Sequence, residues 1–189
     1  MTTTWLGVPA RKSVQDLWLH QEIIADLRPE LVVECGVRFG GSTLYYATVL
    51  DQTGAGRIVG VDVDLSNVAD QVRTHPRVEL WDCSSTDPTV ADRVADCAGP
   101  VFVILDSDHS RDHVYAELES FTPALKPGDY LIVEDSNVNG HPVLPDWGPG
   151  PWEALEDYLK ARPGVYRRDV DREEKFGWTF APGGFLIRI

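Results

Sequence analysis

Carboxylate side chains that could do chemistry follow two strongly apolar runs of the chain. Asp106 comes directly after the run 101–105, and Glu134 and Asp135 come directly after the run 130–133. Because the carboxyl ends of parallel strands form one edge of a sheet, these three acids are expected to converge. Three adjacent carboxylates repel one another unless a cation neutralises them, and an all-oxygen set suits a hard ion such as Mg²⁺.

A histidine stands beside this acid cluster, because His109 follows Asp106 by three residues. An imidazole with an ordinary pKa of about 6.5 suits a general base, and a hydroxyl on a metal needs only a modest base. His113 and His141 are alternative bases, and bulk water is another. Asp108 is a rival to Asp106 as a ligand.

A glycine-rich stretch, LVVECGVRFGGS at 31–42, reads as a buried strand, a glycine loop and the start of a helix. Glycines let the backbone turn tightly and let a ligand approach, and a helix N-terminus offers free N–H groups. The spacing differs from the dinucleotide pattern, because an acid ends the strand. This acid would repel a pyrophosphate and suits a cationic, amino-bearing ligand such as S-adenosylmethionine. The cofactor-binding candidates here are Glu34, Gly36, Arg38, Gly40 and Ser42.

Further cofactor candidates follow the next strands of the predicted sheet. Asp62 ends the strand 57–62, where a carboxylate can accept both ribose hydroxyls of a nucleotide-type ligand. Cys83 and Ser84 follow the third strand and are candidates to border an adenine ring. Asp106, after the fourth strand, is also counted among the cofactor-binding residues.

The apolar periodicity predicts an α/β chain whose strands and helices alternate. A helix capped by Ser13 is expected at 14–27, with apolar residues Val14, Leu17, Trp18, Ile24 and Leu27 on one face. Strands are expected at 31–34, 57–62, 78–81, 101–105 and 130–133, and further helices at 42–50, 65–74, 88–96, 111–122 and 152–160. A terminal hairpin is expected at 178–189, around Pro-Gly-Gly. This order predicts a Rossmann-like, mostly parallel sheet with an antiparallel edge.

One domain is expected over 1–189, with an N-terminal helical lead-in at 1–30, irregular up to residue 12, and a substrate loop at 136–151. His141, Trp147 and Trp152 are weak candidates for contacts with the substrate. A net charge of −13 disfavours nucleic acid and anionic membrane surfaces as partners. Three cysteines at unpaired spacings predict neither a disulfide framework nor a zinc site, and no signal-length apolar segment stands at the N-terminus, so a cytoplasmic protein is expected.

Several motifs in this order resemble the cephalosporin hydroxylase and rhamnosyl O-methyltransferase family. They are VVECGVRFGGST, GVDVD, ILDSDHS, IVEDSNVNGHPV, GPGPWEALEDYL and the terminal FAPGGFLIRI, spread between about residue 18 and residue 189. The resemblance implies a Rossmann-like S-adenosylmethionine-dependent methyltransferase domain with a seven-stranded sheet, helices on both faces and an antiparallel C-terminal hairpin. It also implies Mg²⁺ held by Asp106, Glu134 and Asp135, and a cofactor held by the first strand's motif and Asp62. The position of His109 is similar to that of the lysine base in catechol-type O-methyltransferases.

The expected function is therefore Mg²⁺-dependent O-methylation of a small hydroxylated acceptor, with a natural-product sugar, polyol or vicinal diol first. A non-catalytic cofactor-binding subunit of a tailoring enzyme is an alternative, and a hydroxylase component is a weaker one, because no facial triad for iron is visible. The apolar C-terminus and several tryptophans favour a homo-oligomer.

Overall fold

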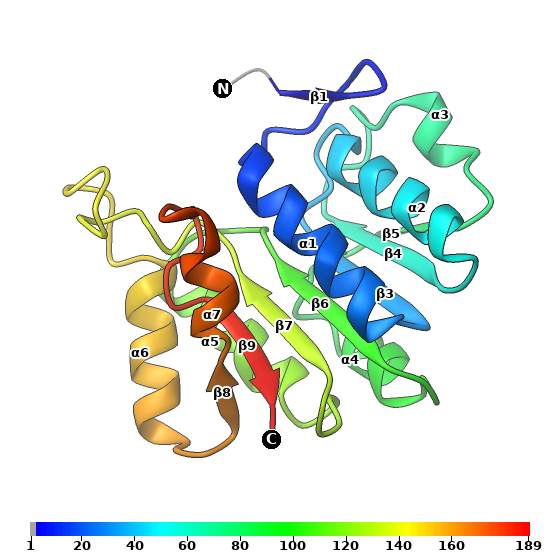
Figure 1. Cartoon of the computed structure of the whole chain (residues 1–189). Helices are drawn as coiled ribbons and strands as arrows, with labels where there is room; N and C mark the ends of the chain where they lie inside the picture. Colours follow the sequence, from blue (N-terminus) through cyan, green and yellow to red (C-terminus); the bar gives the residue numbers. More distant parts are fainter. Residues whose placement is uncertain (1–2) are drawn as a thin grey trace.

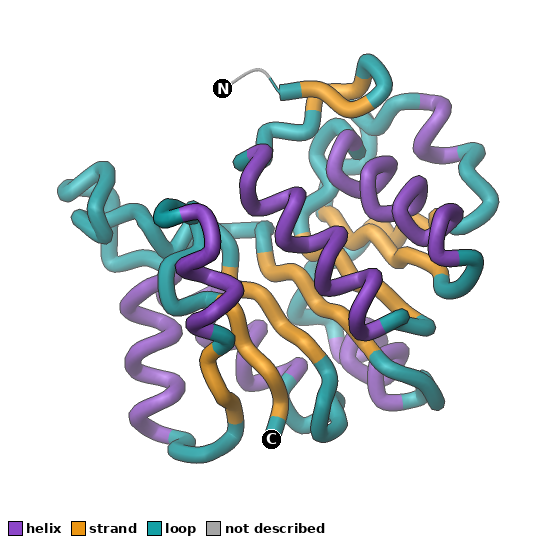
Figure 2. The backbone as a smooth tube through the Cα atoms, in the orientation of Figure 1, coloured by secondary structure: helices purple, strands orange, loops and turns teal. Residues whose placement is uncertain are grey.

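The computed structural model describes residues 3–189, so the first two residues of the predicted lead-in lie outside it. Its centre is a seven-stranded sheet with the order β5-β4-β3-β6-β7-β9-β8 (Figures 1 and 2). The strands are β3 (Leu31–Cys35), β4 (Arg57–Asp62), β5 (Val78–Asp82), β6 (Val101–Leu105), β7 (Tyr130–Val133), β8 (Tyr166–Arg168) and β9 (Phe185–Arg188). The pairs from β5 through β7 are parallel, whereas β9 is antiparallel to both β7 and β8. The predicted Rossmann-like, mostly parallel sheet is confirmed.

Helices cover both faces of the sheet, and each strand contributes alternate side chains to the two faces. On β6, Phe102 and Ile104 pack with α1 (Val14–Leu27) and α2 (Gly41–Thr53). Val103, between them, faces α4 (Pro88–Ala95), α5 (Arg111–Phe121) and α6 (Pro151–Ala161). Figure 1 shows α1 and α2 in front of the sheet and α4 and α5 behind it. Across residues 3–189, no helix is both long enough and apolar enough to cross a bilayer.

Helix α1 has the predicted bounds, and Ser13 caps it by accepting a hydrogen bond from the Asp16 N–H. Its buried face differs from the prediction, because Val14 and Trp18 are 66% and 58% exposed while Asp16 and His20 are fully buried. The first two turns of α1 lie against the polar carboxyl edge of the sheet. Polar side chains there find partners, such as the Phe180 N–H for Asp16, that apolar side chains could not use.

The segment before α1 is not the irregular lead-in that was expected. It forms a hairpin of β1 (Thr4–Trp5) and β2 (Val8–Pro9), which lies over the start of α2 (Figure 1). The Pro9 carbonyl packs so closely on Gly41 that a Cβ there would fall 2.3 Å from its oxygen. The Trp5 indole also donates a hydrogen bond to Thr48, so the hairpin is anchored to α2 at two points.

The prediction of a C-terminal hairpin around Pro-Gly-Gly was wrong about the first of its two strands. Strand β9 pairs with β8, a short strand that the sequence analysis missed. α7 (Val170–Glu173) and the 3₁₀ helix η1 (Glu174–Phe176) connect the two strands. The segment 178–180 turns to α1 instead, where Asp16 binds its backbone. The predicted helix 65–74 is also shorter, because α3 spans only Asp70–Arg73.

Candidate active site

A cavity of about 730 Å³ lies at the carboxyl edge of the parallel strands, where ligands bind in sheets of this kind. Two groups of predicted site residues border it. The cofactor candidates among its lining residues are Gly36, Arg38, Ser42, Asp62, Cys83, Ser84 and Asp106, and the catalytic and metal candidates are Asp106, His109 and Asp135. Glu34, Gly40, Glu134, His141, Trp147 and Trp152 do not line it.

Gly36 makes room for protein backbone. A Cβ at this position would fall 2.0 Å from the Asp106 carbonyl oxygen, and the φ of +93° is unfavourable for other residues. Gly36 also donates its N–H to the Val61 carbonyl at 2.8 Å. This glycine therefore lets the ends of β3, β4 and β6 meet at the cavity, a reason beyond the expected approach of a ligand. Gly40 packs against Val72 away from the cavity.

Asp62 shapes the glycine loop. Its Oδ2 accepts hydrogen bonds from the N–H groups of Val37 and Arg38, both at 2.8 Å, and its Oδ1 accepts one from Asp64 at 3.0 Å. The carboxylate also borders the cavity, so it lies where the ribose interaction was predicted. The backbone contacts give it a second task, because they fix the loop around the cavity.

Glu34 lies behind the cavity wall and is fully buried. Thr43 donates a hydrogen bond to its Oε2 at 2.5 Å, but its Oε1 has no partner among the described residues. Burial raises the pKa of Glu34 to about 7, against the opposing effects of the Lys12 charge and of the neighbouring Ser42 and Thr43 hydroxyls. A buried carboxylate with a free oxygen beside the cofactor wall is a candidate partner for a donor group.

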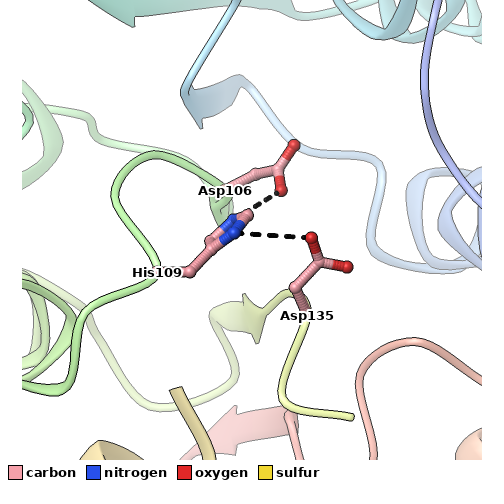
Figure 3. Close-up of side chains that lie close together, drawn as sticks. All are labelled: Asp106, His109 and Asp135. Carbon is pink, nitrogen blue, oxygen red and sulfur yellow. Dashed lines mark hydrogen bonds and ion pairs between the residues drawn. The ribbon is translucent and has the colours of Figure 1, made fainter. Parts of the chain in front are cut away.

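Asp106, His109 and Asp135 come together around the imidazole (Figure 3). His109 Nε2 lies 3.3 Å from Asp106 Oδ1, and His109 Nδ1 lies 3.5 Å from Asp135 Oδ2. One ligand atom from each of these side chains lies within 4.8 Å of the other two, close enough for one metal ion. The structure therefore brings together two of the three predicted metal ligands and the predicted base.

The charges in this cluster shift one another's pKa values. Burial opposes the charged form of His109, but the Asp106 hydrogen bond and the Asp106 and Asp135 charges outweigh burial and raise its pKa. Burial would raise the pKa of Asp106, but the nearby Lys12 and His109 lower it. Burial and the Asp106 charge raise the pKa of Asp135. Within the cluster, the charged form is therefore favoured for Asp106 and His109, whereas the neutral form is favoured for Asp135.

Glu134 turns away from Asp135 and towards the N-terminal segment. Its Oε1 lies 3.0 Å from the Lys12 ammonium and 3.6 Å from His20 Nε2. Lys12 Nζ also lies 2.7 Å from Asp106 Oδ2, so one buried ammonium bridges two of the predicted metal ligands. Burial raises the pKa of Glu134 to about 8, although Lys12 opposes this shift.

The alternative residues lie in different surroundings. His113 borders the cavity and its Nε2 lies 3.0 Å from the hydroxyls of both Ser85 and Ser107. Its pKa is raised, with the Glu117 hydrogen bond as the largest cause. Asp108 also borders the cavity, but its carboxylate accepts the Ser110 N–H and is outside the metal-competent group.

The weak substrate candidates lie together on the loop after β7 and at the start of α6. His141 stacks on Trp152, with ring centroids 4.5 Å apart, and its Nε2 lies 3.0 Å from Glu153 Oε1. Asn139 also donates to Glu153. Trp147 is 52% exposed. The structure gives this loop internal contacts and places none of the three candidates on the cavity wall.

Several cavity residues were missed from the sequence, and most of them belong to the segment before α1 or to strand ends already named. They are Ala10, Arg11, Val63, Asp64 and Asn67. Lys12 was missed as well. Asp16 and His20, four residues apart on α1, form a polar pair on one helical face that the apolar pattern hid, but Lys12 precedes the helix and carries no such signal.

The whole chain, residues 1–189, matches the rhamnosyl O-methyltransferase/CmcI family. The rhamnosyl O-methyltransferase of Mycobacterium tuberculosis is 48% identical over 191 residues, which cover 98% of this chain and 78% of the relative.

Solved structures agree with this relationship. A CmcI structure with Mg and SAM superposes with a TM-score of 0.80 at 22% identity, over 99% of this chain and 76% of its own, which shows a shared fold. The MycE methyltransferase from the mycinamycin biosynthetic pathway, in complex with Mg and SAH, gives a TM-score of 0.52 at 25% identity over 75% of this chain and 40% of its own. By its sequence along the whole length, the chain belongs to the rhamnosyl O-methyltransferase/CmcI family and is a methyltransferase.

Proposed function

We propose that the protein is a Mg²⁺-dependent O-methyltransferase that transfers the methyl group of S-adenosylmethionine to a hydroxyl of a sugar in a natural product. The observation that carries the proposal is that one cavity is bordered by both the glycine loop and the Asp106–His109–Asp135 cluster. Methyl transfer requires the methyl donor and the activated hydroxyl to be bound next to each other. This cavity has residues for binding the donor and residues for activating the hydroxyl.

The cofactor side fits S-adenosylmethionine. The cavity of about 730 Å³ has the size of a cofactor site. Asp62 borders it with a carboxylate for ribose hydroxyls, and Glu34 has a buried oxygen without a partner among the described residues. In related proteins, CmcI and MycE, solved structures contain SAM and SAH, respectively.

The acid side fits a hard divalent cation. Asp106 and Asp135 offer carboxylate oxygens, which Mg²⁺ prefers. Glu134 is the third ligand implied by the family resemblance, and Lys12 holds only one of its two oxygens. When bound, a divalent cation would lower the pKa of an acceptor hydroxyl and stabilise its negative charge.

The chain's own residues supply orientation and a base. Asp106 anchors His109 Nε2, and Nδ1 beside Asp135 is the atom proposed to take the hydroxyl proton. A neutral imidazole is a sufficient base for a hydroxyl that a divalent cation has made more acidic. The glycine loop and Asp62 border the same cavity and would hold the methyl donor there, and positioning supplies much of the rate.

A rhamnosyl hydroxyl is the proposed acceptor, because the M. tuberculosis relative carries that substrate in its name. Self-association is also proposed. It is supported by large apolar side chains that are exposed in the described part of the chain, among them Trp18, Trp147 and Trp178.

The first experiment is calorimetric binding of S-adenosylmethionine to the purified protein, with and without Mg²⁺. Methyl transfer to an aryl rhamnoside is then measured by mass spectrometry, again with and without Mg²⁺. Micromolar cofactor binding and metal-dependent transfer support the proposal. Cofactor binding without transfer to any rhamnoside, sugar or diol favours the non-catalytic subunit, and no cofactor binding refutes the proposal.

A further inference from the structure

Lys12 is a buried cation at the acid cluster, and the chemistry proposed above does not use it. Its side chain is 3% exposed, and its ammonium contacts Asp106 Oδ2 at 2.7 Å and Glu134 Oε1 at 3.0 Å. These carboxylates come from the ends of two neighbouring strands, β6 and β7. A lysine is buried at this depth only when strong partners hold it, and here both partners are acids.

The Lys12 ammonium contacts only one oxygen of each carboxylate. Lys12 binds one oxygen of Asp106 and one oxygen of Glu134. The remaining oxygens are Asp106 Oδ1, which faces His109, and Glu134 Oε2. A side chain that binds one oxygen of a carboxylate also fixes the direction of the second oxygen. Hydrogen bonds from neighbouring residues orient metal-binding carboxylates in the same way.

The charges agree with a cation in addition to Lys12. Asp106, Glu134 and Asp135 follow neighbouring strands, and the Lys12 ammonium can neutralise no more than one of their three carboxylates. Buried charges are tolerated when they are paired, so a divalent cation would complete the pairing that Lys12 begins.

Lys12 is held in place from outside the cluster. The same short segment contributes Ala10 and Arg11 to the cavity wall, and Pro9 packs on Gly41 at the start of α2. The β1–β2 hairpin precedes it and Ser13 begins α1 directly after it. The ammonium is thus delivered by an anchored segment, and removing its charge does not by itself release the segment from the cavity.

We infer that Lys12 is a positioning residue, which orients the Asp106 and Glu134 carboxylates so that they bind the divalent cation of the proposed methyl transfer. This inference rests on the proposed function, because it concerns the metal site assigned there. In the proposed arrangement, Lys12 touches neither the metal nor the acceptor. It acts on the metal only through the two carboxylates.

The test is a Mn²⁺ titration followed by electron paramagnetic resonance, without acceptor, on wild type, Lys12→Gln and Lys12→Arg. Lys12→Gln removes the charge but keeps an N–H donor, and it is expected to weaken Mn²⁺ binding about tenfold or more. Lys12→Arg keeps the charge and is expected to stay within about threefold of wild type. Lys160→Met, on α6 and away from the cavity, is the matched control and should bind like wild type.

Affinity for S-adenosylhomocysteine separates positioning from a general loss of structure. It is measured by calorimetry on each variant and is expected to stay within about threefold of wild type, because the hairpin still anchors the segment. The Mn²⁺ titration is repeated with saturating S-adenosylhomocysteine, which stabilises the folded state of a weakened variant.

Weaker Mn²⁺ binding by Lys12→Gln, with S-adenosylhomocysteine binding kept and Lys12→Arg close to wild type, supports the inference. Equal or tighter Mn²⁺ binding by Lys12→Gln overturns it, and so does an equal loss in both variants. If wild type binds S-adenosylhomocysteine but no Mn²⁺, the proposed metal site fails and the inference fails with it. Normal wild-type binding together with an unaffected Lys12→Gln overturns the inference alone.

Discussion

The glycine loop after β3 and the acid cluster after β6 and β7 border the same cavity, but they are built in different ways. Backbone groups shape the loop, since Gly36 bonds to Val61 and Asp62 binds two loop N–H groups. Side chains shape the cluster, where Lys12 and His109 hold carboxylates from separate strands. The glycines of the loop stand in one short stretch of sequence, and Asp62 lies 25 residues beyond Val37. The side-chain cluster joins residues as far as 122 positions apart in the chain.

Asp106→Asn is the strongest test of a division between the two regions. We expect kcat to fall by at least about 10³-fold, because the cluster loses a charged ligand and the anchor of His109. Affinity for S-adenosylhomocysteine should stay within about threefold. Steady-state kinetics and calorimetry measure the two effects. Asp108→Asn is the matched control and should keep most of the activity, because Asp108 lies outside the metal-competent group. A parallel loss of cofactor affinity in Asp106→Asn would show that the regions are not separable.

Gly36→Ala should damage both regions at once, because this glycine touches the Asp106 backbone. A Cβ 2.0 Å from the Asp106 carbonyl oxygen, at a φ of +93°, is expected to lower the free energy of unfolding by at least about 3 kcal/mol. Urea denaturation measures the loss. Gly54→Ala is the control, since Gly54 has a similar φ of +78° and no atom within 4 Å of a built Cβ, so about 1 kcal/mol is expected there. Equal losses in the two variants would contradict the crowding at Gly36.

The same contrast explains what could be predicted from the sequence. The strand ends were visible because Asp62, Asp106 and Asp135 follow apolar runs directly, and the parallel order of the strands brings them to one edge. Lys12 was not visible, because its partner Glu134 lies 122 residues away in the chain. A periodic apolar pattern indicates which face of a helix is expected to be buried. It does not indicate that the helix packs against a polar edge of the sheet, where polar side chains are buried instead.

The errors in α1 and β8 have the same origin. Val14 and Trp18 fit the apolar spacing but are exposed, because the first turns of α1 face a polar edge. Strand β8 is only three residues long, YRR, with no apolar alternation, and its pairing with β9 supplies the hydrogen bonds that define it. Tertiary contacts, which no local pattern records, decided both elements.

Glu34→Gln tests whether a buried carboxylate near the glycine loop is compensated less well than the carboxylates of the acid cluster. Lys12 and His109 compensate Asp106, whereas one Glu34 oxygen has no partner within residues 3–189 and burial raises the pKa of Glu34 to about 7. A carboxyl whose folded pKa lies above its unfolded value binds more protons when folded, so it lowers stability as the pH rises from about 4.5 to about 7. We expect the cofactor-free variant to be more stable than wild type by about 2–3 kcal/mol at pH 8, and by much less at pH 5.

Urea denaturation of wild type and Glu34→Gln at the two pH values provides this measurement. The difference between the two proteins cancels the contributions of the other titrating groups, as long as the substitution leaves them unchanged. A difference that does not change between pH 5 and pH 8 would mean that Glu34 finds compensation after all, and the contrast with the acid cluster would disappear.

Asp62→Asn is the mirror of Asp106→Asn and has the smallest expected effect. The amide keeps the shape of the carboxylate but accepts hydrogen bonds more weakly. If its oxygen stays on the Val37 and Arg38 N–H groups, its NH2 group faces the Asp64 N–H, and that hydrogen bond is lost. We expect affinity for S-adenosylhomocysteine to fall about tenfold, with Mn²⁺ affinity unchanged. Calorimetry and the Mn²⁺ titration measure both on the same preparation. Equal weakening of Mn²⁺ and cofactor binding would contradict this expectation. It would mean that a change in the glycine loop displaces Asp106 through its close packing on Gly36, so that the loop also determines the geometry of the metal site.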